Sequence, residues 1–105
     1  MASEQEHHDF EAAVARHVPA LVSYLAGLTR QRAEAEELAQ ETLVRAFRAF
    51  PRFRSEPGGP DRTWGWLRTI AVNRWRSAAR DRSRDRRLVG ALTPPLSPKR
   101  PTVTR

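Results

Sequence analysis

The sequence contains no cysteine and no long apolar run. Without cysteine, the chain can form neither a disulfide framework nor a cysteine-based metal site. No apolar stretch approaches the roughly 20 residues that a membrane-spanning helix needs. The start of the chain is polar and acidic, which excludes a signal peptide. We therefore expect a cytoplasmic protein, and its 105 residues allow at most one small domain.

The residue groupings that mark catalytic and metal sites are also missing. Two of the three histidines, His7 and His8, are adjacent, and no Ser–His–Asp arrangement is implied. Adjacent histidines project in different directions on a helix, and no third ligand type with suitable spacing follows. Gly58 and Gly59 stand alone rather than in a phosphate-binding loop before a helix. The sequence predicts neither an enzyme nor a cofactor or metal site.

Lysine is nearly absent, since 18 of the 19 basic residues are arginine and Lys99 is the exception. Residues 1–50 hold five arginines and eight acidic residues, a net charge of −3. Residues 51–105 hold fourteen basic and four acidic residues, a net charge of +10. GC-rich coding explains part of the arginine content but not this asymmetry. The basic half indicates a polyanionic partner, most simply nucleic acid.

The strongest helical pattern covers Ala33–Phe50. Negative charges come first and positive charges follow, which suits the helix dipole, and Glu41 and Arg45 form a favourable pair one turn apart. Pro51 is expected to end the helix. The apolar stripe consists of Ala35, Leu38, Ala39, Thr42, Leu43, Ala46, Phe47 and Phe50.

A first helix is expected over Asp9–Leu28, with Asp9 as its N-cap. Pro19 lies within this pattern and either kinks the helix or divides it into two short ones. The connection Thr29–Arg32 is short, which makes the first and second helices antiparallel neighbours.

The segment Pro51–Arg62 holds three prolines and two glycines in twelve residues, so it forms no regular element. Two interpretations of it stay open. It is either a linker that Phe53 anchors, or a shaped loop beside a ligand on a rigid helical scaffold.

A third helix is expected over Thr63–Arg87, capped by Asp61 or Thr63. Eight arginines cover most of its surface, and three tryptophans lie in its first half. Arginine beside exposed aromatic rings is typical of proteins that bind single-stranded nucleic acid. The alternative is that all three tryptophans belong to the core. The expected apolar face is Trp64, Leu67, Ile70, Ala71, Trp75 and Ala78.

These elements predict an all-α fold, a small three-helix bundle that has four helices if Pro19 breaks the first. We expect a polar leader over residues 1–8, a helical domain over 9–88 and a flexible Pro-rich linker or tail over 89–105.

Two segments of the chain form a pattern at a fixed separation. The first is AEAEELAQETLVRAFRAFPRF, and the second, about ten residues later, is TWGWLRTIAVNRWRSAAR. Together they resemble region two of the extracytoplasmic-function (ECF) sigma factors of bacterial RNA polymerase. The resemblance covers about residues 10–87. In that family an acidic helix with an aromatic-rich end precedes a loop and the pattern Trp-Leu-x-x-Ile-Ala-x-Asn, which is Trp66–Asn73 here.

The resemblance implies a partner for each half of the domain. The second helix would dock on the clamp helices of the polymerase β′ subunit through Glu37, Leu38, Gln40, Glu41, Val44 and Arg45. The loop and third helix would hold the non-template strand of the minus-ten promoter element, with one base flipped from the stack. The DNA-binding residues would be Phe53, Arg54, Ser55, Arg62, Trp64, Trp66, Asn73, Arg74, Arg76 and Arg80.

The chain departs from the family pattern in several places. Ser77 replaces a common acidic residue, Thr63 replaces a usual aromatic residue, and the PGGP loop is unusual. A short helix that usually precedes the first is replaced by the polar leader. The domain that reads the minus-thirty-five element does not follow, so the sequence is either cut at the inter-domain linker or a one-domain protein.

The resemblance implies a cytoplasmic, nucleoid-associated bacterial protein that binds core polymerase and promoter DNA, with an anti-sigma factor as a further partner. One alternative is a regulatory one-domain protein that occupies polymerase or an anti-sigma factor without starting transcription. Another is a generic basic protein that binds single-stranded nucleic acid through phosphate contacts alone.

Overall fold

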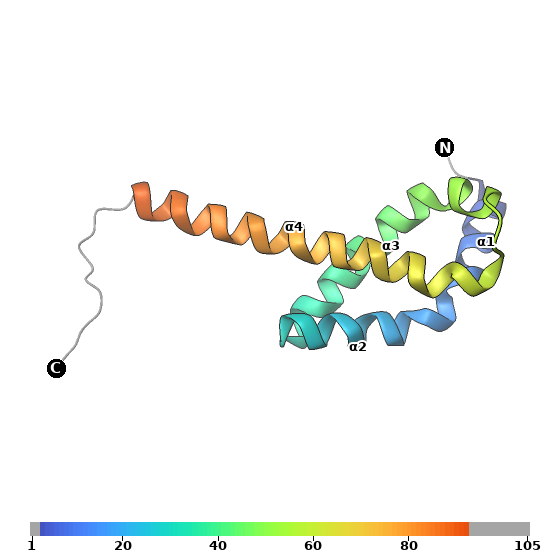
Figure 1. Cartoon of the computed structure of the whole chain (residues 1–105), viewed down its shortest axis with the longest axis horizontal. Coiled ribbons are helices and arrows are strands. Elements are labelled where there is room, and N and C mark those ends of the chain that lie inside the picture. Colours follow the sequence, from blue (N-terminus) through green and yellow to red (C-terminus); the bar gives the residue numbers. More distant parts are fainter. Residues whose placement is uncertain (1–2, 93–105) are drawn as a thin grey trace. The chain divides into compact units, whose positions relative to one another are not determined.

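A computed structural model describes residues 3–92, and every regular element in that range is helical, as the sequence predicts. The first compact unit ends at Trp75 and the second begins at Arg76, within the last helix. In chain order the elements are α1 (Glu4–Val14), the 3-10 turn η1 (Ala15–His17), α2 (Val18–Thr29), α3 (Arg32–Ser55), the 3-10 turn η2 (Pro60–Arg62) and α4 (Thr63–Leu92) (Figure 1).

The helix α1 begins earlier than the sequence analysis predicts, and Asp9 is not its N-cap. Ser3 takes that role: its Oγ accepts a hydrogen bond from the Glu6 N–H, and the Glu6 carboxylate accepts one from the Ser3 N–H, both at 3.1 Å. This capping box satisfies two N–H groups that a helix start otherwise leaves unpaired. Residues 4–8, predicted as a polar leader, are therefore the first turns of α1.

Pro19 divides the first predicted helix in two, which is one of the two expected alternatives. The α-helical backbone ends at Val14, and the 3-10 turn Ala15–His17 precedes a new helix. Pro19 lies in the first turn of α2. A missing N–H does no harm there, because the first N–H groups of a helix have no partner within it.

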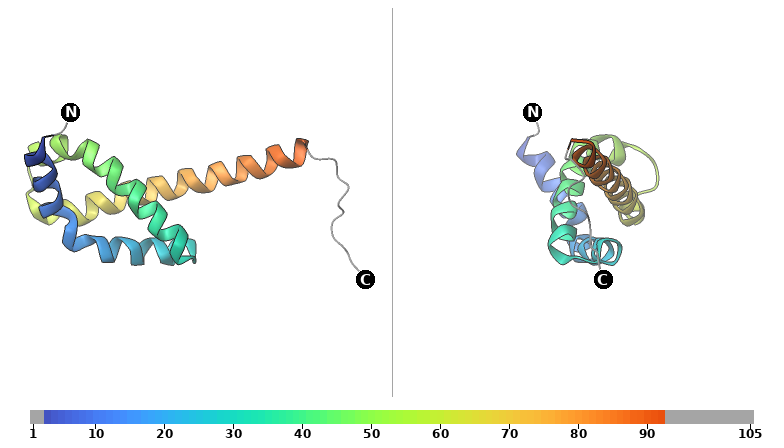
Figure 2. Two further views of the ribbon diagram at one scale, coloured as in Figure 1. Left: turned by 180° about the vertical axis from the view of Figure 1, so that it is seen from behind. Right: turned by 90° about the vertical axis from the view of Figure 1, so that its left-hand side faces the viewer.

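The helices α2 and α3 are neighbours that run in opposing directions, as the short connection predicts (Figures 1 and 2). Arg30 ends α2 in a left-handed conformation, with φ of 64°, and its N–H donates to the Ala26 carbonyl at 2.8 Å. Thr29 Oγ1 bonds both the N–H and the carbonyl of Gln31. These contacts fix the reversal between the two helices.

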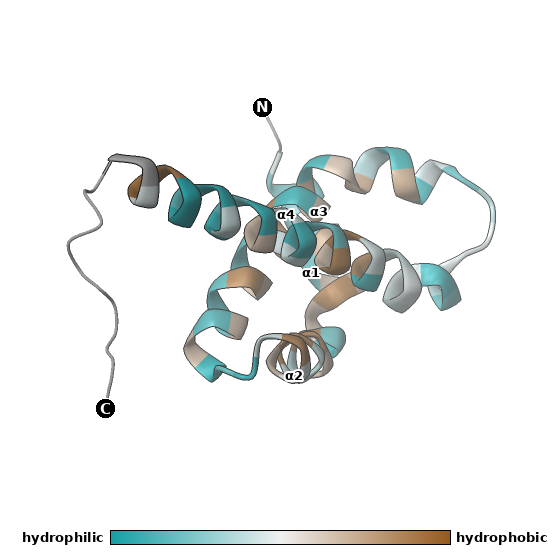
Figure 3. Ribbon diagram, turned by 60° about the vertical axis from the view of Figure 1, so that its left-hand side comes forward, coloured by the Kyte–Doolittle hydropathy of each residue, from teal (hydrophilic) through white to brown (hydrophobic). Residues whose placement is uncertain are grey.

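The apolar stripe of α3 is the centre of the core. Leu21 and Leu25 of α2 are fully buried, as are Leu67 and Ala71 of α4. Figure 3 shows that α2 is mostly hydrophobic, whereas much of α4 is hydrophilic. The buried residues of α3 are Ala35, Leu38, Ala39, Thr42, Ala46, Phe50 and Phe53.

The helix α3 continues through Pro51 to Ser55, so the predicted end at Phe50 is wrong. An internal proline costs about 3 kcal/mol or more. The extra turn buries Phe53 on the stripe that Phe50 continues, and burying an aromatic side chain returns about 1.5–3 kcal/mol. Two donors also satisfy carbonyls of the last turn: the Ser55 hydroxyl bonds the Arg52 carbonyl at 2.9 Å, and the Glu56 N–H bonds that of Phe53 at 3.2 Å.

The start and end of α4 also differ from the prediction. Neither Asp61 nor Thr63 is its N-cap, because Asp61 lies in η2 and the backbone at Thr63 is already helical. The helix ends at Leu92 rather than Arg87, so the first residues of the predicted tail, from Val89, are helical. The rest of that tail, residues 93–105, lies outside the described residues.

Candidate nucleic-acid interface

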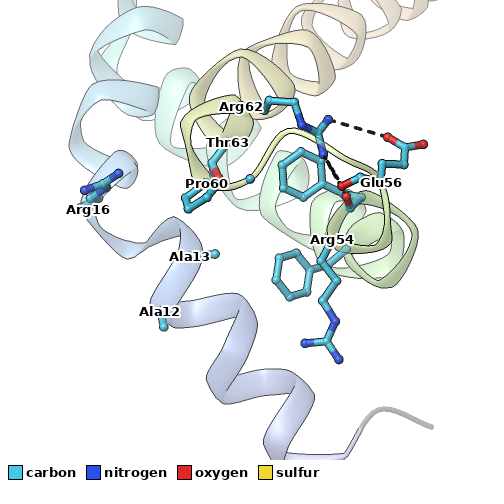
Figure 4. A pocket seen from close by; sticks show the side chains of 11 residues that line it. Ala12, Ala13, Arg16, Arg54, Glu56, Pro60, Arg62 and Thr63 are labelled. Carbon is cyan, nitrogen blue, oxygen red and sulfur yellow. Dashed lines mark hydrogen bonds and ion pairs between the residues drawn. The ribbon is translucent and has the colours of Figure 1, made fainter.

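A pocket of about 460 Å³ lies between α1, the end of α3 and the loop that leads to α4 (Figure 4). Phe50, Phe53 and Pro60 contribute apolar surface to it. Three arginines line it as well, namely Arg16 from η1, Arg54 from the last turn of α3, and Arg62 from η2. Guanidinium groups around an apolar surface suit a ligand that has both a flat apolar part and an anionic part.

Arg62 ties the loop to the end of α3. Its Nη2 donates to the carbonyl of Phe53 at 3.1 Å and to that of Glu56 at 3.4 Å. Its Nη1 lies 3.7 Å from the Glu56 carboxylate (Figure 4). Because the last carbonyls of a helix have no partner within it, Arg62 acts as a side-chain cap on α3.

Gly58 makes this arrangement of Arg62 possible. Its φ of 127° is a conformation that residues with side chains rarely adopt, and a Cβ there would overlap the Arg62 side chain. The PGGP loop departs from the family pattern, and its first glycine has a structural reason. A Cβ at Gly58 would overlap both Nε and Cδ of Arg62, so a side chain there would displace Arg62.

Phe53 is not an open stacking surface. One face of its ring stacks on Trp66, with centroids 4.1 Å apart and planes 16° apart. The Arg62 guanidinium carbon lies over the ring, 4.4 Å from its centroid. Phe53 is only 6% exposed, so it anchors the end of α3 while it also lines the pocket. The anchor and the shaped loop, which sequence analysis treated as alternatives, therefore coexist.

The three tryptophans of α4 are all partly buried, between the two expected extremes. Trp64 stacks near His17, at 6.1 Å between ring centroids, and meets the edge of Tyr24 at 6.3 Å. Trp66 packs against the buried cluster around Phe53. Trp64 and Trp66 therefore pack against neighbouring side chains and keep part of their surface in solvent.

Arg54 is held by α1 rather than free in the pocket. Its Nη1 lies 2.7 Å from Oδ2 of Asp9, and Gln5 donates to the other carboxylate oxygen at 2.9 Å. The hydrogen bond from Arg54, followed by the one from Gln5, lowers the pKa of Asp9 below its ordinary value. Asp9 and Arg54 are 45 residues apart, and no local pattern in the sequence links them.

A second ion pair joins α3 to α4. Arg74 Nε donates to Glu41 at 2.6 Å, and the Arg74 side chain is only 18% exposed. Asn73, the next residue along α4, is exposed. The predicted DNA-binding Arg74 and the predicted polymerase-binding Glu41 are therefore direct partners.

The geometry can be compared with known proteins. The family model for Sigma-70 region 2 matches residues 13–85. The chain is 44% identical over 82 residues to RNA polymerase sigma factor CarQ of Myxococcus xanthus. The chain belongs to the Sigma-70 region 2 family. The match covers 78% of this chain but only 42% of that relative. No solved structure matches the chain.

The predicted polymerase-binding residues of this region-two domain do not all reach its surface. Glu37, Gln40, Val44 and Arg45 are exposed on α3, with Val44 at 52%. Leu38 is 4% exposed and belongs to the core, because it falls on the apolar stripe.

The predicted DNA-binding residues of the region-two domain fall into two units. Arg76 and Arg80 belong to the second unit, where Arg80 donates to the Ser77 hydroxyl at 3.3 Å. The pocket brings together Phe53, Arg54 and Arg62, and Ser55 follows them at the exposed end of α3.

Sequence reasoning missed three residues that shape this site, namely Asp9, Arg16 and Glu56.

Within residues 3–92, no group of three or more His, Cys, Asp or Glu side chains could hold a metal ion. No helix in the same range is long and apolar enough to cross a membrane.

Proposed function

We propose that this chain is the region-two module of an ECF sigma factor, joining core RNA polymerase to the single-stranded minus-ten element of a promoter. The module acts by binding, without catalysis and without a cofactor. The observation that carries this proposal is the arginine-rich pocket at the end of α3, which has a size and chemistry suited to a nucleotide.

A base flipped out of the non-template strand would enter this pocket. Flipping costs a few kcal/mol, which contacts in the pocket must offset. Arg62 already lies over the Phe53 ring, so the guanidinium that lines the pocket is held in place before a base enters. Arg54, which lines the pocket, and Ser55, which follows it at the end of α3, would bind the backbone of the same strand.

The helix α4 would hold the neighbouring part of the strand. The Asn73 amide offers a donor and an acceptor for the edge of a base, and it is exposed. Trp64 and Trp66 keep partly exposed rings for stacking. Arg74, Arg76 and Arg80 would bind phosphates.

The exposed face of α3 would dock on the β′ clamp helices of polymerase. Glu37, Gln40, Val44 and Arg45 lie on it, with Glu41 at its edge. Acidic side chains there would steer a basic partner and fix its register. Leu38 would support this face from beneath, because it is buried under it.

The test is to measure binding of the chain to core polymerase and, in that complex, to a library of single-stranded minus-ten oligonucleotides. We expect a base preference that Asn73→Ala weakens, and polymerase binding that Glu41→Arg disrupts. Unchanged polymerase binding by Glu41→Arg would contradict the docking face. If Asn73→Ala binds every oligonucleotide as the parent does, the proposed base reading is wrong.

The same measurements separate the two alternatives. A regulatory protein that only occupies polymerase, or an anti-sigma factor, would bind its protein partner but show no preference in the library. A generic binder would show a steep salt dependence, no base preference and no need for polymerase.

A further inference from the structure

We propose that Arg16, on the α1 side of the pocket, binds the backbone phosphate of the nucleotide whose base occupies the pocket. This inference rests on the proposed function and extends it to a residue outside both segments that carry the family resemblance. Arg16 would contact the phosphate alone and leave the base to the other side of the pocket.

The hydrogen bonds and ion pairs of the three pocket arginines distinguish Arg16 from the other two. Arg54 is paired with Asp9 at 2.7 Å. Arg62 is engaged by two carbonyls and by the Glu56 carboxylate. Arg16 is exposed and has no hydrogen bond or ion pair with any residue in the described range 3–92. Of the three, Arg16 can therefore bind an anion without first giving up an acidic partner.

The backbone around Arg16 is fixed on both sides, so its side chain starts from a defined position. Val14, two residues before it, is 4% exposed and belongs to the core cluster. His17, directly after it, stacks near Trp64 at 6.1 Å between ring centroids. Both contacts hold the turn η1, where α1 gives way to α2, against the rest of the first unit.

The layout of the pocket gives the ligand an orientation. The surface formed by Phe53 and Arg62 belongs to the α3 and loop side, and Arg16 belongs to the opposite, α1 side (Figure 4). A nucleotide whose base rests on the α3 side would direct its sugar and phosphate toward α1. A guanidinium can bind two phosphate oxygens at once, which suits Arg16 for that end of the ligand.

The experiment uses the full chain bound to core polymerase and the oligonucleotide that binds best in the library. Each phosphate of that oligonucleotide is replaced in turn by an uncharged methylphosphonate, and each base in turn by an abasic site. Affinities are compared for the parent, Arg16→Gln and the control Arg32→Gln. Arg32 is also exposed and makes the same charge change, but it lies at the start of α3 away from the pocket.

We expect one methylphosphonate position to weaken the parent and Arg32→Gln but not Arg16→Gln. The abasic position with the largest loss should weaken all three proteins by the same factor, since Arg16 does not touch the base. The salt slope is the slope of the logarithm of the binding constant against the logarithm of the salt concentration. Losing one phosphate contact to a single strand makes this slope shallower by about 0.7. Raising salt from about 50 to 200 mM should therefore weaken Arg16→Gln by a factor roughly threefold smaller than the factor for the parent.

Other outcomes overturn different claims. If every methylphosphonate affects Arg16→Gln and the parent equally, Arg16 holds no phosphate and this inference is wrong, whatever the abasic scan shows. If the parent binds all abasic variants equally well, no base is captured and the proposed function is wrong. If Arg32→Gln lowers the salt slope as much as Arg16→Gln does, the loss reflects net charge and the inference is also wrong.

Discussion

The two ends of α3 carry the two proposed binding regions, and they are built in different ways. From its first turns to its middle, α3 is a regular helix from which Glu37, Gln40, Val44 and Arg45 are exposed to solvent. At its other end, the pocket depends on contacts that α1, α3 and the following loop make with one another. A regular helix face needs only the core beneath it, whereas the pocket needs several specific contacts at once.

The charge available in the pocket differs from what the net charge of the sequence suggests. The second half of the sequence has a net charge of +10, yet two of the three pocket arginines have acidic partners within the fold. Net charge therefore predicts attraction of nucleic acid to the basic half as a whole. It does not predict which guanidinium groups are available, because that depends on pairs such as Arg54 with Asp9.

The largest loss of stability and binding is expected for a change in the core of α3, because both proposed binding regions depend on that helix. Leu38→Ala removes a side chain that is 4% exposed beneath the exposed face of α3. Truncating a buried leucine to alanine costs about 2–5 kcal/mol of unfolding free energy. Urea denaturation should show this loss, and binding to polymerase and to oligonucleotides should fall together.

The control for that variant is Val44→Ala, on the same helix but 52% exposed. It should change the unfolding free energy by less than about 0.5 kcal/mol while it weakens only polymerase binding. If Leu38→Ala left oligonucleotide binding unchanged, the two regions would not share one folded support.

A smaller and local effect is expected for Gly58→Ala. The new Cβ overlaps the Arg62 side chain, and the φ of 127° is strained for alanine, at a cost of about 1–3 kcal/mol. We expect weaker oligonucleotide binding with polymerase binding unchanged. Gly59→Ala is the matched control for the overlap, because a Cβ there meets no atom within 4 Å. Equal losses in both variants would mean that backbone strain, rather than Arg62, controls the pocket.

Much of the fold could be predicted because it depends on periodicity. The stripe on α3 predicted the core residues from Ala35 to Phe50, and Pro19 marked the division between α1 and α2. The helix ends were harder to predict. Burial of Phe53, together with the hydrogen bonds at the last turn of α3, offset the breaking tendency of Pro51. The capping box at Ser3 lies in a stretch that sequence patterns described only as polar.

The pocket could be predicted only in part. The family resemblance assigned the loop, Phe53, Arg54 and Arg62 to DNA binding. These residues lie close together in the sequence, so one segment was enough to identify them. The α1 side could not be found in this way, because the packing of α1 on α3 brings Arg16 to the pocket and Asp9 to Arg54. Contacts between residues about 45 positions apart leave no periodic signal in a single sequence.

Removing the ion pair between Glu41 of α3 and Arg74 of α4 should have a modest effect on stability. Glu41→Ala removes the acceptor for Arg74 and should cost roughly 0.5–1 kcal/mol, since Glu41 is partly exposed and solvent screens the pair. Glu41→Gln keeps an oxygen near Arg74 Nε and should cost less. Thermal denaturation compares the two variants. If both lower oligonucleotide binding equally, the charge of Glu41 and not its hydrogen bond positions Arg74.

The smallest effect is expected from the exposed pair of Asp9 and Arg54, and it depends on pH. Because the folded-state pKa of Asp9 is lowered, its carboxylate stabilises the fold above the ordinary pKa of 3.8, and this stabilisation is lost as pH falls through the folded-state pKa. Asp9→Asn should therefore melt slightly below the parent at about pH 7. The difference should begin to shrink near the ordinary pKa of 3.8 and vanish once the pH is below the folded-state pKa. Glu11→Gln makes the same charge change on the same helix and is the control for the loss of one negative charge from α1. If the difference between Asp9→Asn and the parent widened as pH fell, the ion pair would not join α1 to the end of α3, and the α1 side of the pocket would be held by packing alone.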